Sequence, residues 1–145
     1  MVAAIDTKLN TVVGIKKYKK IFQSRTMAKR TLRELRLLRL LKHSNIISLI
    51  RVITPQESKT YNDVYGIFEI METDLAQIIR SPQLLYRDHI QYFMFQLMLG
   101  LLYLHSFGVI HRDIKPRNLL VNEDCKLKVA GMTLVKYLNI FLLTA

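Results

Sequence analysis

Hydrophobic positions along the chain repeat at helical spacing in three segments. Between Ser24 and Lys42 leucines recur three and four residues apart with arginines between them, which predicts an amphipathic helix. Asp88 to Phe107 shows the same spacing over a longer stretch, and Gly108 follows it as a natural terminating residue. A third, short helix is predicted over Asp74 to Arg80, before Ser81-Pro82.

Short apolar runs between polar turns predict strands. They are rich in β-branched residues, which favour extended backbone. The predicted strands are Thr11 to Lys17, Ile46 to Thr54, Val64 to Phe68, Asn118 to Val121 and Lys126 to Ala130. The last two flank the polar turn NEDC.

Two apolar segments raise the question of a membrane span. Ile90 to Leu104 carries no formal charge, but it is only about 15 residues long, whereas a span needs about 20. Asn139 to Ala145 is shorter still. The first segment is therefore predicted to be a buried core helix, and no membrane partner is expected.

Composition places the chain among proteins that form a hydrophobic core. Its 145 residues are 50% hydrophobic and 23% charged, which suits one modest domain or a piece of a larger one. The single cysteine, Cys125, excludes a disulfide framework and a multi-cysteine zinc site. An intracellular, reducing compartment is the expected location.

The positive charge is concentrated in the first third of the chain. The formal net charge is +11, and the residues up to Arg51 hold 13 of the 22 basic side chains but only two acids, Asp6 and Glu34. The remainder is balanced, with nine of each sign. This asymmetry fits either a surface for nucleic acid or another polyanion, or a solvated basic helix.

The segment Val109 to Val121, VIHRDIKPRNLLV, carries the most specific motif. It contains H-R-D, a lysine two residues later and an asparagine five residues after the aspartate. Phosphoryl transfer needs a carboxylate that accepts the proton of the attacking hydroxyl, a cation near the transferred group and an amide oxygen on a metal. Asp113, Lys115 and Asn118 fit those three roles. A basic turn between helix and strand is the alternative, and the fixed pattern argues against it.

From this motif outwards the chain resembles a eukaryotic Ser/Thr protein kinase, most closely the MAP kinases of the CMGC group. The stretches that carry the resemblance are AIDTKLNTVVGIKK, AKRTLRELRLLRLLKHSNIISL, NDVYGIFEIMETDLAQIIR and VIHRDIKPRNLLVNEDCKLKV. Cyclin-dependent kinases are the nearest alternative. The resemblance implies an incomplete α+β kinase fold: a partial N-lobe over 1–70, the start of a C-lobe over 71–136, and an unrelated apolar tail over 137–145.

The same resemblance implies roles for further residues. Lys16 would pair the α/β-phosphates of ATP, and Glu34 of the following helix would hold Lys16. Phe68 would stand at the gatekeeper position, and Gly14 replaces the usual alanine over the adenine. Glu69 and Met71 lie in the stretch that would bind the adenine edge, and Asp74 would meet the ribose. Taken singly, Asp74 is equally a good helix N-cap.

Three features of the family are missing. The Gly-rich loop is absent, Gly131-Met132-Thr133 replaces D-F-G, and the chain stops before the activation loop and most of the C-lobe. Asn118 is then the one remaining metal ligand, so an impaired Mg²⁺ site is expected.

Three hypotheses therefore compete. The chain is an ATP-dependent Ser/Thr kinase whose activity as given is in doubt, a pseudokinase-type binding fragment, or a nucleic-acid-binding basic protein. The resemblance further implies protein substrates or signalling partners in the cytoplasm or nucleus. The apolar helix from Asp88 implies self-association.

Overall fold

The computed structural model describes residues 1–8, 10–55 and 62–137. They divide into two compact units. Unit 1 comprises residues 1–42 and 47–70, and unit 2 comprises residues 43–46 together with the chain from Met71 onward. The predicted tail lies almost wholly outside the described residues, as does most of the polar connection before Val64.

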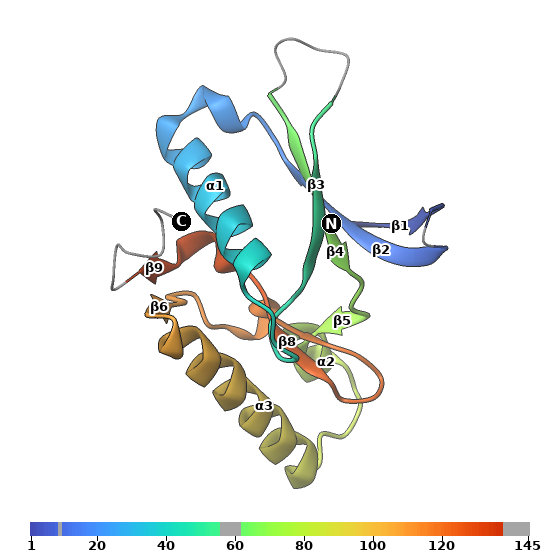
Figure 1. The fold of residues 1–145 in the computed structure, drawn as a ribbon. Helices are drawn as coiled ribbons and strands as arrows, with labels where there is room; N and C mark the ends of the chain where they lie inside the picture. The colour runs from blue at the N-terminus through green and yellow to red at the C-terminus, as the bar shows by residue number, and fades with distance from the viewer. Residues whose placement is uncertain (9, 56–61, 138–145) are drawn as a thin grey trace. The chain divides into compact units, whose positions relative to one another are not determined.

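Unit 1 is an antiparallel sheet with one long helix (Figure 1). Its strands have the order β1-β2-β4-β3 and its helix, α1, follows a short 3₁₀ turn, η1. The bounds are β1 Val2–Asp6, β2 Thr11–Tyr18, η1 Ile21–Gln23, α1 Arg25–Leu40, β3 Leu49–Ile53 and β4 Val64–Glu69. The predicted helix and the three predicted strands of this region are confirmed.

The strand predicted over Ile46 to Thr54 begins later than its apolar pattern suggested. The run starts with two isoleucines, yet β3 begins at Leu49. Ile46 instead forms a parallel bridge with Val129 of unit 2, and His43 stacks on Tyr103 with ring centroids 4.6 Å apart. These long-range contacts, which no local pattern encodes, assign residues 43–46 to unit 2.

The buried side of α1 follows the predicted periodicity. Leu37 and Leu38 are buried, and so is Glu34, which pairs with Lys16 of the neighbouring β2 strand. Tyr18 and Ile21 are buried with Val64, and Leu35 packs against them. Ser24 is the N-cap residue of α1, but its side chain forms no capping hydrogen bond.

Unit 2 consists of two further helices, short strands and two 3₁₀ turns. Thr73–Asp74 joins two predicted strands in a sheet of order β5-β7-β8, and a second, two-stranded sheet pairs β6 with β9. The bounds are β5 Thr73–Asp74, α2 Leu75–Arg80, α3 Arg87–Ser106, β6 Val109–Ile110, η2 Pro116–Asn118, β7 Leu119–Val121, β8 Leu127–Val129, η3 Met132–Leu134 and β9 Lys136–Tyr137. The two-residue strands were not predicted, because they are too short to show a periodicity.

Helix α3 has the predicted extent and end. Gly108, with a φ of 65°, lies just beyond the C-cap residue Phe107, a backbone conformation that glycine adopts without a Cβ clash. One face of α3 is buried. Four large apolar side chains elsewhere on the helix are exposed: Met94, Phe95, Met98 and Leu102. No helix in the described part of the chain is long and apolar enough to cross a membrane.

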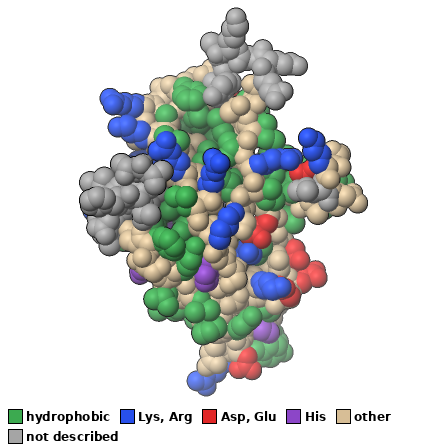
Figure 2. Space-filling view, in the orientation of Figure 1, with side chains coloured by type: hydrophobic (Ala, Val, Ile, Leu, Met, Phe, Trp, Pro, Cys, Tyr) green, Lys and Arg blue, Asp and Glu red, His purple; other side chains and the backbone are tan. Residues whose placement is uncertain are grey.

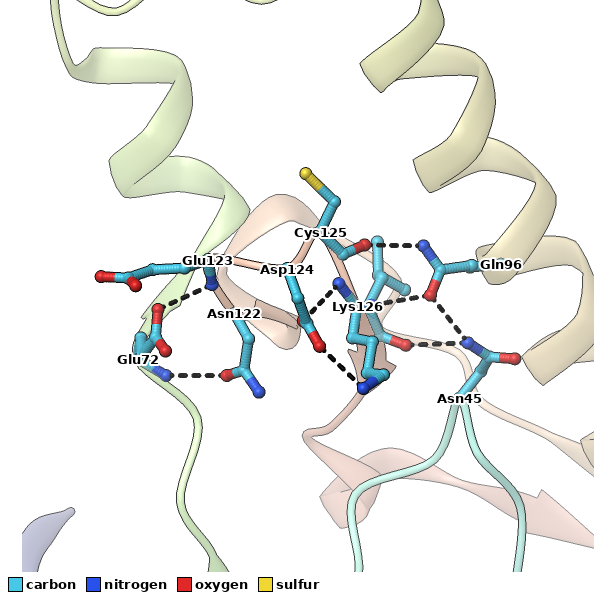
Figure 3. A network of polar contacts seen from close by, with 9 residues as sticks. Asn45, Glu72, Gln96, Asn122, Glu123, Asp124, Cys125 and Lys126 are labelled. Carbon is cyan, nitrogen blue, oxygen red and sulfur yellow. Dashed lines mark hydrogen bonds and ion pairs between the residues drawn. The ribbon is translucent and has the colours of Figure 1, made fainter.

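The buried amide of Gln96 ties α3 to the β7–β8 hairpin (Figure 3). Its Oε1 accepts hydrogen bonds from the backbone N–H of Leu127 (2.9 Å) and from Nδ2 of Asn45 (3.2 Å). Its Nε2 donates to the carbonyl of Cys125 at 2.8 Å. Asn45 also donates to the carbonyl of Leu127. Gln96, together with Asn45, thus satisfies backbone groups of Cys125 and Leu127 in the hairpin.

A second set of contacts holds the other side of the same turn (Figure 3). The backbone N–H of Glu72 donates to Oδ1 of Asn122 at 3.2 Å, and a carboxylate oxygen of Glu72 accepts from the N–H of Glu123 at 2.7 Å. Lys126 pairs with Asp124 at 2.7 Å across the turn. The predicted polar turn NEDC is therefore fixed from both sides.

Replacing Gln96 should show how much this network contributes. Gln96→Leu keeps the side-chain volume but leaves the Leu127 N–H and the Cys125 carbonyl without partners in a buried place. We expect the free energy of unfolding, measured in urea, to be about 3 kcal/mol lower than that of the wild type. Gln91→Leu, the same change at an exposed position of α3, should shift the free energy of unfolding by no more than about 0.5 kcal/mol. Equal effects of the two variants would contradict the assignment.

Candidate active site

The predicted catalytic residues meet in the loop between β6 and β7. The carboxylate of Asp113 lies 2.9 Å from Nζ of Lys115, measured to either oxygen. Asn118 donates from Nδ2 to the Asp113 backbone carbonyl (2.7 Å) and to its Oδ2 (2.9 Å). The 3₁₀ turn η2 brings Asn118 back towards Asp113, with its N–H bonded to the carbonyl of Lys115. The structure thus groups the three residues that the motif singled out.

These neighbours set the charge state of Asp113. The hydrogen bond from Lys115 and, next, the one from Asn118 hold the pKa of the Asp113 carboxyl below its usual range. The group is therefore ionised at neutral pH. An ionised, positioned carboxylate orients a hydroxyl and accepts its proton late in a transfer, which is what the motif requires.

His111 has a structural role in the loop. It is 1% exposed, and its Nε2 lies 2.8 Å from the carbonyl oxygen of Ala130. Its Nδ1 accepts a hydrogen bond from the backbone N–H of Asp113 at 3.2 Å. Burial lowers the pKa of His111, although the bond to the Ala130 carbonyl opposes the shift. A neutral ring with its proton on Nε2 satisfies both contacts and links the catalytic loop to the end of β8.

Arg112 continues this link further along the chain. Its backbone lies in the left-handed region with a φ of 66°, which is uncommon for a non-glycine residue. Its Nε donates to the carbonyl of Leu134 in η3. The segment after β8 is therefore attached to the loop by His111 and by Arg112.

Gly131 occupies the position where the family has a metal-binding aspartate. Its φ is 79°, and a Cβ built on it would lie 2.6 Å from Cγ of Asn118 and 2.7 Å from both terminal atoms of that amide. The Asn118 side chain thus fills the space that a side chain at 131 would need.

The polar groups around Asn118 are engaged with one another. Mg²⁺ favours octahedral oxygen ligation with one or two carboxylates. Here Gly131 offers none, and both oxygens of Asp113 are engaged by Lys115 and Asn118. The described residues also contain no group of three His, Cys, Asp or Glu side chains that could hold a metal.

Unit 1 holds the predicted ion pair. Nζ of Lys16 in β2 lies 2.6 Å from Oε1 of Glu34 in α1. The Glu34 side chain is 3% exposed and that of Lys16 is 32% exposed, so the carboxylate is buried while the ammonium can still meet an anion.

Tyr18 belongs to the same group, and the sequence analysis missed it. Nζ of Lys16 lies 4.6 Å from the centroid of its ring, a cation–π distance. Burial, and next the charge of Glu34, raise the pKa of the Tyr18 phenol far above its ordinary value. The signal was available, because Tyr18 follows Lys16 by two residues on one strand face.

The remaining predicted residues occupy the end of β4 and the start of α2. Phe68 is 2% exposed, and the Glu69 carboxylate accepts a hydrogen bond from the N–H of Ser48 at 2.7 Å. Met71 begins unit 2. Asp74 is the N-cap of α2, where Oδ1 accepts from the N–H of Gln77 at 3.0 Å. The capping role foreseen for Asp74 is confirmed, and it leaves Oδ2 bonded to the Gln77 side chain.

Over Gly14 lies the side chain of Met1. A Cβ added at Gly14 would be 2.9 Å from Sδ of Met1 and 3.7 Å from the carbonyl oxygen of Glu69. The flexible thioether of Met1 therefore occupies part of the space beside Gly14, which the resemblance did not imply.

Unit 2 also contains a pocket that no sequence pattern pointed to. It encloses about 250 Å³ between the α2–α3 connection and the β7–β8 turn. Apolar side chains of several elements line it, among them Ile78, Leu84, Leu85, Phe93 and Val121, together with Glu72, His89, Glu123 and Cys125. These residues are scattered over about 50 positions of sequence, so only the tertiary fold assembles them.

Comparison with known proteins identifies the family. The protein kinase domain family matches residues 1–140. The chain belongs to the protein kinase family.

Its similar relatives are mitogen-activated protein kinases of plants. The chain is 50% identical over 137 residues to mitogen-activated protein kinase 4 of Oryza sativa subsp. japonica, covering 94% of this chain and 37% of the relative. It is 50% identical to rice mitogen-activated protein kinase 3 over 134 residues, which are 92% of this chain and 36% of that protein. With mitogen-activated protein kinase 2 of Arabidopsis thaliana the identity is 47% over 137 residues, or 94% and 36% of the two chains.

The chain thus spans little more than a third of the length of these relatives. It is a MAP kinase-like Ser/Thr kinase fragment with a partial α+β kinase fold. Kinases of this family use ATP and Mg²⁺ in general.

The kinase ion pair can be tested by a double-mutant cycle. Lys16→Met leaves Glu34 buried without its cation, so we expect a coupling of about 1–3 kcal/mol between Lys16→Met and Glu34→Gln in urea unfolding. Lys17 and Asp63 form a matched control, because they lie 2.7 Å apart but with side chains 40% and 27% exposed. The cycle with Lys17→Met and Asp63→Asn should show no measurable coupling. Additive effects of Lys16→Met and Glu34→Gln would argue against a functional pair.

The neutral state of His111 predicts a pH dependence of stability. Because its pKa is lowered in the folded kinase fragment, the unfolded chain binds the extra proton first. Stability is therefore fully present above the unfolded pKa of about 6.5 and is lost as the pH falls, by at most about 1.4 kcal/mol per pH unit. Urea unfolding between pH 7.5 and 5 measures this loss. His111→Gln, which cannot titrate, should flatten the profile, and parallel profiles of the two proteins would contradict the prediction.

Proposed function

We propose that this MAP kinase-like fragment binds a nucleotide such as ATP weakly and without dependence on Mg²⁺. The observation that carries the proposal is the packing of the Asn118 amide against Gly131, which leaves the metal without its carboxylate ligand. The residues that favour binding are cationic instead. Lys16 and Lys115 both keep exposed ammonium groups, 32% and 51% exposed as side chains.

Each residue has a definite part in this proposal. Lys16, oriented by Glu34 and resting on the Tyr18 ring, contacts the α/β-phosphates. Glu69 and Met71 present the backbone that binds the adenine edge, behind which the buried Phe68 closes the pocket. Asp74 contacts the ribose, although its carboxylate also caps the N-terminus of α2. Lys115 neutralises the terminal phosphate in place of a metal ion.

The family reaction is phosphoryl transfer from ATP to a protein serine or threonine. For it, Asp113 orients the acceptor hydroxyl and takes up its proton, while Lys115 compensates charge on the transferred group. The depressed pKa of Asp113 supports the orienting part, because the group is ionised and its oxygens are held in place. We propose that the 145-residue chain alone binds nucleotide without measurable transfer, since a metal-bound aspartate is required for transfer in the family.

Protein partners form the second part of the proposal. The pocket beside the β7–β8 turn is lined by leucine, isoleucine and phenylalanine side chains with two glutamates among them. Such a lining suits a partner segment that carries apolar and basic side chains. The exposed apolar residues of α3 support self-association in addition. The reducing, intracellular setting expected from the single cysteine agrees with signalling partners.

Titration of a fluorescent ATP analogue, with Mg²⁺ and with chelator, tests the nucleotide proposal. The dissociation constants of the unmodified chain should agree within about twofold in the two buffers. Gly131→Asp restores the missing carboxylate, provided that the Asn118 amide rotates away, and should bind more tightly with Mg²⁺. Gly131→Asn is the matched control, because it carries the same backbone strain and nearly the same volume without the charge.

Three outcomes would contradict the proposal in whole or in part. Strong enhancement by Mg²⁺ in the unmodified chain would mean that another carboxylate reaches the site. Loss of all nucleotide binding on chelation would mean the same. Unchanged binding in Lys16→Met would remove the phosphate contact from the proposal.

A further inference from the structure

The outward face of α1 carries a regular row of cations. Arg25, Lys29, Arg36 and Arg39 are exposed, and with Leu32 they form a stripe at spacings of four, three, four and three residues. Residues at this spacing lie above one another on one side of an α-helix. Figure 2 shows lysine and arginine side chains gathered over the part of the surface where Figure 1 draws α1.

This row is not explained by the stability of α1 itself. The first turn contains no acid, so Arg25 faces the positive end of the helix dipole. Neighbouring cations three and four residues apart repel one another by about 0.2–0.5 kcal/mol per pair. The one acid of the helix, Glu34, is buried on the opposite side and paired with Lys16. Apart from Arg39, which lies in the last turn where a cation is favourable, the charges of the stripe therefore cost folding free energy.

No carboxylate of the described residues forms an ion pair with these four cations. The ion pairs in the described part of unit 1 involve Lys16, Lys17 and Arg51 instead. The stripe is thus a solvated, uncompensated positive surface along a helix of 16 residues. Negative charge supplied from another molecule would relieve both the repulsion and the unfavourable dipole contact.

Two leucines decide between the kinds of anionic partner. Leu32 is 52% exposed and lies within the stripe, and Leu40 is 63% exposed at its end. A nucleic-acid backbone offers phosphates but no apolar surface for them, and the stripe has no aromatic side chain for stacking. A membrane-bound helix inserts a broad apolar face, whereas the apolar face of α1 is buried in unit 1.

We propose that an acidic amphipathic helix of a protein partner docks along this face of α1. Its carboxylates would pair with Arg25, Lys29, Arg36 and Arg39, and its apolar side chains would cover Leu32 and Leu40. The spacing of the stripe matches the ridges by which two helices pack. This surface is separate from Lys16 of β2, the proposed phosphate contact, which pairs with Glu34 on the opposite, buried side of α1.

The test uses the full 145-residue chain and a synthetic helical peptide. The fluorescein-labelled peptide has three heptads, with glutamates along its facing stripe and leucines at its centre, and its binding is measured by fluorescence anisotropy. The variant Arg25→Gln/Lys29→Gln/Arg36→Gln/Arg39→Gln should bind at least about tenfold more weakly. A matched control removes four exposed cations elsewhere, Lys8→Gln/Arg80→Gln/Arg87→Gln/Arg117→Gln, and should stay within about twofold of the unmodified chain.

Further arms separate helix docking from general attraction between charges. Leu32→Ser should weaken binding severalfold without a change in net charge, and circular dichroism checks that each variant retains its helix content. A peptide with glutamine in place of glutamate should not bind. Equal losses in the two quadruple variants, or no binding of the acidic peptide by the unmodified chain, would overturn the proposal. Tighter binding of a DNA duplex or of phosphatidylserine vesicles than of the peptide, lost in the α1 variant, would overturn it in favour of that polyanion.

Discussion

The side-chain amide of Asn118 is the contact on which the catalytic loop depends. It donates hydrogen bonds to the backbone carbonyl and the carboxylate of Asp113, while the backbone carbonyl of Asn118 accepts the N–H of Ala130, so this residue joins the loop to the end of β8. The same side chain fills the space beside Gly131. A residue that belongs to a metal site in the family is here engaged in holding a carboxylate. These contacts, formed by side chains of the chain itself, are the physical basis for proposing nucleotide binding that does not need Mg²⁺.

Buried polar side chains organise each unit, and several of them form hydrogen bonds to groups far away in the chain. In unit 1 the buried Glu34 is held by Lys16, and Tyr18 places its ring beside that ammonium. In unit 2 Gln96 satisfies the backbone of a hairpin about 30 residues later in the chain. His111 does the same for the ends of the catalytic loop and β8. Unpaired groups of this kind are costly in a protein interior, so these contacts define the arrangement within each unit more closely than apolar packing does.

The positive charge on the outer side of α1 is not explained by the interactions that stabilise the fold. Its buried side supplies the core and the ion pair, and these follow from hydrophobic spacing and from one acid in a basic stretch. Its outer side carries cations that neither the helix nor the described part of the chain neutralises. Cations that repel one another along one face of a helix are best explained by an anionic partner outside the chain. The composition left open which kind of polyanion the basic residues bind. The structure favours a protein partner, because two exposed leucines lie among the cations.

The sequence by itself determined the long elements and the catalytic loop. α1 and α3 follow from helical periodicity, because side-chain spacing reports which face of a helix is buried, whereas β2 and β4 follow from short apolar runs between polar turns. The H-R-D motif predicted a group formed by Asp113, Lys115 and Asn118, since all three lie within six residues and a short loop can only keep them close. The tertiary structure alone decided where β3 begins, the two-residue strands, the place of Tyr18 beside Lys16 and the pocket beyond α2. It also decided that Asn118 occupies the space at Gly131. Each of these depends on residues far apart in the chain, and local spacing carries no information about such contacts.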